Sequence, residues 1–242
     1  MNRLAALVVA GALASTAPAK AFDFAPGDYV PLPAGTTIFA GYLQGARSTE
    51  FRLDGVGSVP DSKLGTVVGI ARFVHYTSLA GGAAEFQVIA PFGRINSAKI
   101  GGTDLPVDDG IADVTVAAGY WPVVADPANP YGTTIGGTFY VTLPTGAYDF
   151  GKVSLGSGTT TFTPQVGLVQ GLGPKLFLDA GIDAAFALDH REQGVQVSRD
   201  PVYSFQAYLR YQPEPTTNLS VGYAGATGGK LDFDGSASGQ KV

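Results

Sequence analysis

Apolar and polar residues alternate along most of this chain. In the stretch KLFLDAGIDAAFAL, residues 175–188, apolar side chains occupy every second place, and Lys175, Asp179 and Asp183 stand between them. Because successive side chains of a β-strand point to opposite faces of the sheet, this pattern predicts a strand with one apolar and one polar face.

The same period of two recurs in eight further stretches, each closed by turn residues, whereas no sustained helical period occurs. The sequence therefore predicts an all-β fold of nine strands. We expect them at 36–45, 66–76, 84–92, 112–120, 134–143, 160–168, 175–188, 202–211 and 217–223.

The connections between these strands alternate between short and long. The long ones, after the first, third, fifth and seventh strands, are residues 46–65, 93–111, 144–159 and 189–201, and no connection after the second, fourth, sixth or eighth strand is longer than any of these. Up-and-down β-barrels of the bacterial outer membrane show this asymmetry, with short turns on the periplasmic side and long loops outside. The pattern predicts an antiparallel transmembrane barrel, because a closed sheet satisfies its backbone hydrogen bonds within lipid.

Composition favours the same interpretation. Only 14% of the residues are charged, against roughly 25% in average soluble proteins. The apolar faces are nearly uninterrupted and carry aromatic residues near their ends, which suits contact with membrane lipid. A secreted, soluble β-sandwich that binds a ligand is the alternative, since its core also requires alternation.

The first 21 residues have the three parts of a secretory signal peptide: a short basic start, an apolar core and a small-residue cleavage site. We expect residues 22–242 to form one β-barrel domain in the outer membrane of a Gram-negative bacterium. The chain has no cysteine, which excludes disulfides and thiolate metal sites. Its formal net charge of −5 gives no support to nucleic-acid binding.

Three stretches carry a resemblance to a known family: GIADVTVAAGYWPV (110–123), LPTGAYD (143–149) and FTPQVGLVQGLG (162–173). In their order along the chain they resemble the outer-membrane proteins of the meta-pathway of phenol degradation family. The resemblance implies a β-barrel channel, linked in some members to uptake of aromatic compounds. Family members usually continue with more strands. Since single-chain bacterial barrels have an even strand number, we expect about 12 strands in a full-length chain, with the last ones missing here.

The polar faces of the predicted strands supply the candidate site residues. Charged groups in an enclosed face need partners or water, so these residues either pair in a structural network or set the preference of a pore for its solute. Tyr140 and Tyr208, which point inward by the same alternation, either stack against an aromatic solute or pack within a narrow barrel. The predicted lumen-lining residues are Arg72, Glu85, Gln87, Asp113, Tyr140, Asp179, Asp183, Gln206, Tyr208 and Arg210.

Catalytic chemistry has little support in the sequence. Of the two histidines, His75 fits a residue at the periplasmic rim, and His190 fits a solvated loop. The acidic stretch 101–113 lacks the ligand spacing of a calcium loop. We therefore expect no enzymatic activity, no metal and no cofactor.

The leading functional hypothesis is an outer-membrane channel for passive uptake of small, aromatic or hydrophobic solutes. Its partners would be outer-membrane lipid and the small-molecule solute, with no nucleic acid, and its oligomeric state is left open. The alternative within the same fold is a structural or adhesive barrel with a closed lumen, in which the long loops carry the function.

Overall fold

The computed structural model describes residues 24–53, 57–126, 128–129, 131–149, 151–234 and 236–237. The predicted signal peptide lies outside these residues. In the described part of the chain, no helix is long and apolar enough to cross a membrane.

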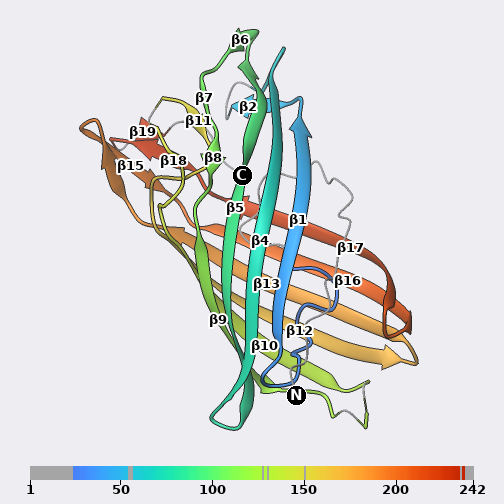
Figure 1. The fold of residues 1–242 in the computed structure, drawn as a ribbon. Helices are drawn as coiled ribbons and strands as arrows, with labels where there is room; N and C mark the ends of the chain where they lie inside the picture. Colours follow the sequence, from blue (N-terminus) through green and yellow to red (C-terminus); the bar gives the residue numbers. More distant parts are fainter. Residues whose placement is uncertain are drawn as a thin grey trace.

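Nine long strands form one antiparallel sheet in which each strand pairs with its neighbours in sequence (Figure 1). The sheet curls into a half-barrel, with β1 and β17 as its edges. The predicted all-β, up-and-down architecture is confirmed. The strands are β1 (Thr37–Ser48), β4 (Lys63–Leu79), β5 (Gly82–Ile100), β9 (Thr115–Val123), β10 (Thr133–Thr142), β12 (Thr161–Gly173), β13 (Leu176–Ala187), β16 (Val202–Glu214) and β17 (Thr217–Gly228).

Turn length alternates as the sequence predicted. β4 and β5 are joined by Ala80 and Gly81, which both have a positive φ, of 50° and 83°. Positive φ at both central residues is the condition for a type I′ hairpin turn, whose twist matches that of the strands it joins. Two-residue connections also join β12 to β13 and β16 to β17.

The long connections are less irregular than predicted, because they contain short strands. Residues 93–100, expected in a loop, continue β5, and Gly93 allows this since a Cβ there would overlap the backbone at Val67. The other short elements are β2 (Phe51–Leu53), β3 (Gly57–Val59), β6 (Thr103–Asp104), β7 (Val107–Asp108), β8 (Gly110–Ile111), β11 (Val153–Ser154), β14 (His190–Glu192), β15 (Val195–Arg199), β18 (Leu231–Phe233) and β19 (Ser236–Ala237).

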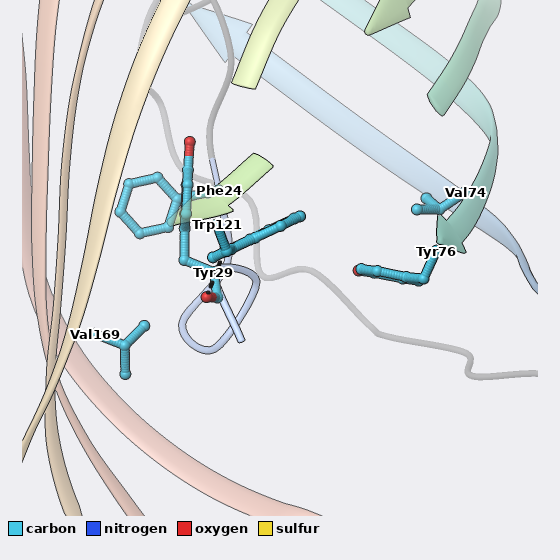
Figure 2. Packing of buried hydrophobic residues seen from close by; sticks show 6 residues of the cluster. All are labelled: Phe24, Tyr29, Val74, Tyr76, Trp121 and Val169. Atoms are coloured by element: carbon cyan, nitrogen blue, oxygen red, sulfur yellow. Dashed lines mark hydrogen bonds between the residues drawn. The ribbon is translucent and has the colours of Figure 1, made fainter. Parts of the chain in front are cut away.

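The hydrophobic core is small and largely aromatic. It contains Phe24, Tyr29, Tyr76 and Trp121, together with two valines (Figure 2). Phe24 and Tyr29 precede the first strand, so the segment before β1 supplies part of the interior of the half-barrel. This segment has no strand periodicity, so the sequence pattern predicts no role for it.

Candidate functional site: the polar interior and the N-terminal segment

The two faces of the sheet differ sharply in chemistry. Along β13, Ile182 is 63% exposed, whereas its neighbour Asp183 is 7% exposed. The same alternation holds on β16 for Phe205 and Gln206. Apolar side chains therefore point away from the half-barrel and polar ones point into it, which is the reverse of a soluble sheet.

The structure brings most of the candidate residues together on the inner face. Arg72 and Tyr208 are partly buried, and the other eight are buried. The buried ones are Glu85, Gln87, Asp113, Tyr140, Asp179, Asp183, Gln206 and Arg210.

Asp113 differs from its predicted place. The expected strand 112–120 begins only at Thr115, so Asp113 lies just before β9. Its carboxylate accepts hydrogen bonds from the Gly146 amide (2.9 Å), the Ser157 amide (2.7 Å) and the Ser157 hydroxyl (2.6 Å). The Asp113 carboxylate thus holds the connection between β10 and β12 in place by these three hydrogen bonds.

The most completely buried charges are Asp179 on β13 and Arg210 on β16. Arg210 donates to the Asp179 carboxylate from Nε (2.7 Å) and Nη2 (3.2 Å), and from Nη1 to Gln212 (2.6 Å). Its guanidinium also lies 4.5 Å from the centroid of the Phe177 ring. A bidentate pair with further donors and acceptors satisfied is the arrangement in which a buried ion pair is tolerated.

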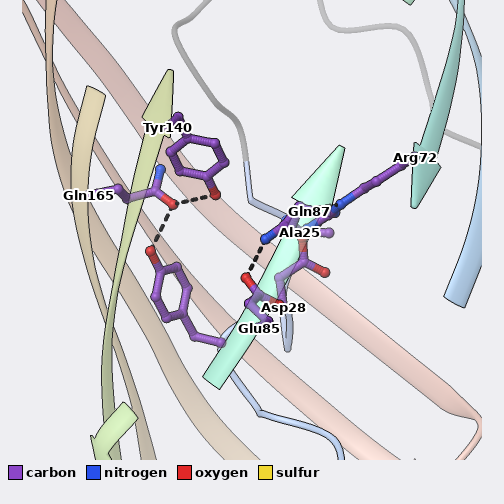
Figure 3. A network of polar contacts seen from close by, with 8 residues as sticks. Ala25, Asp28, Arg72, Glu85, Gln87, Tyr140 and Gln165 are labelled. Carbon is purple, nitrogen blue, oxygen red and sulfur yellow. Dashed lines mark hydrogen bonds and ion pairs between the residues drawn. The ribbon is translucent and has the colours of Figure 1, made fainter. Parts of the chain in front are cut away.

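A second polar cluster extends from β4 to β5. Arg72 donates from Nε to Gln87 Oε1 (2.9 Å), and Gln87 in turn donates to Glu85 (Figure 3). Arg72 Nη1 also lies 3.6 Å from Asp28 Oδ2. The charged candidates therefore pair with neighbouring strands and with the segment before β1.

That N-terminal segment, residues 24–36, is folded into the half-barrel. Its turn is closed by hydrogen bonds from the Asp28 amide to Ala25 O (2.9 Å) and from the Val30 amide to Gly27 O (3.0 Å). The Gly27 amide donates to Asp179 Oδ1 (3.1 Å). Sheet side chains thus bind the backbone of the segment as well as its side chains.

Tyr29 is the best-anchored side chain of the segment. Its hydroxyl donates to Gln165 Oε1 (2.8 Å), which also accepts from the Tyr140 hydroxyl (3.3 Å). Trp121 donates from its indole nitrogen to the Tyr29 carbonyl (3.0 Å). A cavity of about 50 Å³ remains beside Tyr29, and Arg72, Glu85 and Tyr140 are among its lining residues.

Four site residues were missing from the candidate set: Asp28, Tyr29, Trp121 and Gln165. Gln165 had the correct parity in its predicted strand, and extending the β9 pattern by one residue would have placed Trp121 on the inner face. Asp28 and Tyr29 gave no such signal, because no period links the N-terminal segment to the sheet.

The histidines lie away from this site. His75 is within β4, and its Nδ1 lies 2.9 Å from the Thr37 hydroxyl. The interpretation of His190 as a solvated loop residue is wrong: it lies in β14 against Tyr148, and among the described residues its buried ring nitrogens have no hydrogen-bond partner. Burial raises the pKa of the Tyr148 hydroxyl and lowers the pKa of Arg199 nearby.

An antiparallel meander with an apolar outer face and a polar inner face defines the wall of an outer-membrane β-barrel. The chain belongs to the family described as "Putative MetA-pathway of phenol degradation", which matches residues 19–241. This confirms the family that the sequence motifs indicated.

Among solved structures, the chain is similar to an outer membrane channel from Pseudomonas putida F1. The two share 31% sequence identity and superpose with a TM-score of 0.80, over 90% of this chain and 82% of the channel. The chain is therefore a homologue of an outer membrane channel. No curated protein matches it.

Proposed function

We propose that residues 22–242 form an outer-membrane channel domain, exported by the signal peptide at residues 1–21, that admits small, neutral, aromatic or hydrophobic solutes by passive passage. The observation that carries this proposal is the division of the sheet into an apolar outer face and a polar inner face. Lipid suits the first face, and a solute path suits the second.

The pairing of charges supports a preference for neutral solutes. Asp179 is bound by Arg210, and Arg72 lies beside both Asp28 and Gln87. A paired charge attracts a passing ion less than an isolated one, since the field of each partner offsets that of the other. The amides and hydroxyls of the inner face supply hydrogen bonds to a solute without regard to net charge.

The aromatic side chains of the interior support the second part of the proposal. Trp121, Tyr29 and Phe24 are buried there beside polar groups. Ligand sites for small molecules commonly combine an aromatic surface with a few fixed polar groups. The interior has both, so it suits a solute with a ring and one or two hydroxyls.

The N-terminal segment also favours a second candidate function. Because it fills part of the half-barrel, the same wall would suit a structural or adhesive barrel with a closed lumen. Swelling of liposomes that contain the purified full chain separates the two, since only a channel lets an uncharged sugar pass at an appreciable rate.

Two substitutions on one strand make this experiment specific. Gln206→Trp places a large ring on the inner face, and Leu209→Trp places the same ring on the outer face. We expect Gln206→Trp to reduce the swelling rate and single-channel conductance several-fold, with Leu209→Trp unchanged. Impermeable liposomes with the unaltered chain, or equal rates for the two variants, would refute the channel.

A further inference from the structure

Three glycines stand side by side across the middle of the inner face. Gly136 on β10 pairs with Gly167 on β12, and Gly167 pairs with Gly181 on β13. Each lies beneath an aromatic ring: Trp121 over Gly136, Tyr29 over Gly167 and Phe24 over Gly181. A Cβ at any of the three positions would overlap its ring, so the glycines form a flat floor on which rings lie.

The rings above this floor form a continuous row. The centroids of Tyr76 and Trp121 are 6.2 Å apart, those of Trp121 and Tyr29 6.3 Å, those of Tyr29 and Phe24 5.4 Å, and those of Phe24 and Tyr208 5.9 Å. Most of these contacts are edge-to-face, the geometry that the ring quadrupole favours.

The rings of Tyr29 and Phe24 belong to the N-terminal segment. The other three rings of the row belong to strands of the sheet. Tyr29 is also a phenol, and its hydroxyl donates to Gln165 Oε1 at 2.8 Å, an acceptor that it shares with the Tyr140 hydroxyl at 3.3 Å. The floor at Gly167 and Gly181, the flanking rings of Trp121 and Tyr208, and the Gln165 acceptor thus make a place for two rings and one hydroxyl.

We propose that this place, the aromatic slot, is a binding site for planar phenolic solutes of one or two rings, and that Phe24 and Tyr29 occupy it when no solute is bound. This proposal rests on the proposed channel function and adds the site at which the solute binds during passage. A solute in the slot competes with Phe24 and Tyr29, so the apparent affinity for the solute falls as the fraction of molecules in which these two rings occupy the slot rises.

Trp121 is the only tryptophan of the chain, so its fluorescence reports on the slot directly. The experiment uses the purified full chain in detergent and 4-nitrophenol, which absorbs in the range of tryptophan emission and quenches it when bound nearby. In the double variant Phe24→Ala/Tyr29→Ala, we expect the half-saturating concentration of 4-nitrophenol to fall about tenfold, because the competing rings are gone.

A matched pair of glycine substitutions tests the floor. Added to the double variant, Gly167→Ala should raise the half-saturating concentration about tenfold, because its methyl group occupies the space of the solute ring. Gly41→Ala on β1 should change nothing, since a Cβ there meets no atom within 4 Å. Phenol should displace the probe, and cyclohexanol, with a hydroxyl but no aromatic ring, should not.

Equal half-saturation in the unaltered chain and the double variant would overturn the slot, as would equal effects of Gly167→Ala and Gly41→Ala. If the double variant does not fold, the single Tyr29→Ala variant serves in its place, because it removes the ring over Gly167 and should also lower the half-saturating concentration of 4-nitrophenol. Permeation is measured on the same preparations. An impermeable protein with the expected order of affinities refutes the channel alone, and a permeable one without that order refutes the slot alone.

Discussion

Asp179 and Arg210 lie on neighbouring strands, and two hydrogen bonds join the carboxylate to the guanidinium inside the half-barrel. The same carboxylate accepts the Gly27 amide, so one residue of β13 holds both a neighbouring strand and the N-terminal segment. Through these hydrogen bonds Asp179 links the sheet to the N-terminal segment inside the half-barrel.

Replacing one member of this pair should be costly. Asp179→Ala leaves Arg210 buried without its counter-charge, and we expect a loss of about 3–5 kcal/mol of unfolding free energy. Urea unfolding of the protein in detergent, followed by circular dichroism, measures this. The double variant Asp179→Leu/Arg210→Met should be more stable than Asp179→Ala, because no unpaired charge remains. As a control, Lys152→Ala removes the exposed Lys152–Asp149 pair and should leave the unfolding midpoint in place.

The contact between Arg72 and Asp28 should hold the N-terminal segment in place. Asp28→Ala removes the ion pair and the hydrogen bond from the Ala25 amide, so the segment should detach more often. We expect larger single-channel conductance and stronger quenching of Trp121 by acrylamide. Arg94→Ala, at an exposed position of β5, should alter neither quantity. Unchanged conductance and quenching in Asp28→Ala would show that other contacts suffice.

The long connection between β10 and β12 should depend on Asp113. Asp113→Ala removes the acceptor of three hydrogen bonds and leaves the Gly146 and Ser157 amides without it. We expect proteases to cut within residues 143–160 at least several times faster, because the connection opens more often. Asp104→Asn, at an exposed residue of β6, is the control and should be cut at the original rate.

The sidedness of the sheet can be read by spin labels, since the chain has no cysteine of its own. Single cysteines at Ile182 and Asp183 carry the label in liposomes. We expect the label at 182 to be accessible to oxygen, which dissolves in lipid, and the label at 183 to a water-soluble nickel complex. Equal accessibility at both positions would contradict the assignment of the two faces.

The strands were predictable from the sequence because period-two alternation is a local property. It placed all nine long strands in order and gave the orientation of Asp179, Gln206 and Arg210. The alternation predicted too early a start for β9. Ala112 and Asp113 continue the apolar–polar alternation of the strand, but they form no part of its ladder of hydrogen bonds. Hydrogen bonds to distant loop amides set the place of Asp113, and no local pattern encodes them.

The contents of the half-barrel were not predictable in the same way. Phe24 and Tyr29 lie over glycines that are more than 130 residues away in sequence. These glycines become neighbours only through the register in which β12 pairs with β13. A pattern of single strands shows that glycines lie on the inner face, but their alignment across strands depends on register, which turn geometry determines.

This arrangement has a consequence for assembly. Tyr29 is made before every strand, yet its hydrogen-bond partners Trp121 and Gln165 are 92 and 136 residues further along the chain. Contacts between such distant residues carry a large closure entropy and form only when the intervening chain is ordered. Tyr29, although it is synthesised before all the described strands, must therefore be among the last residues to reach its native position.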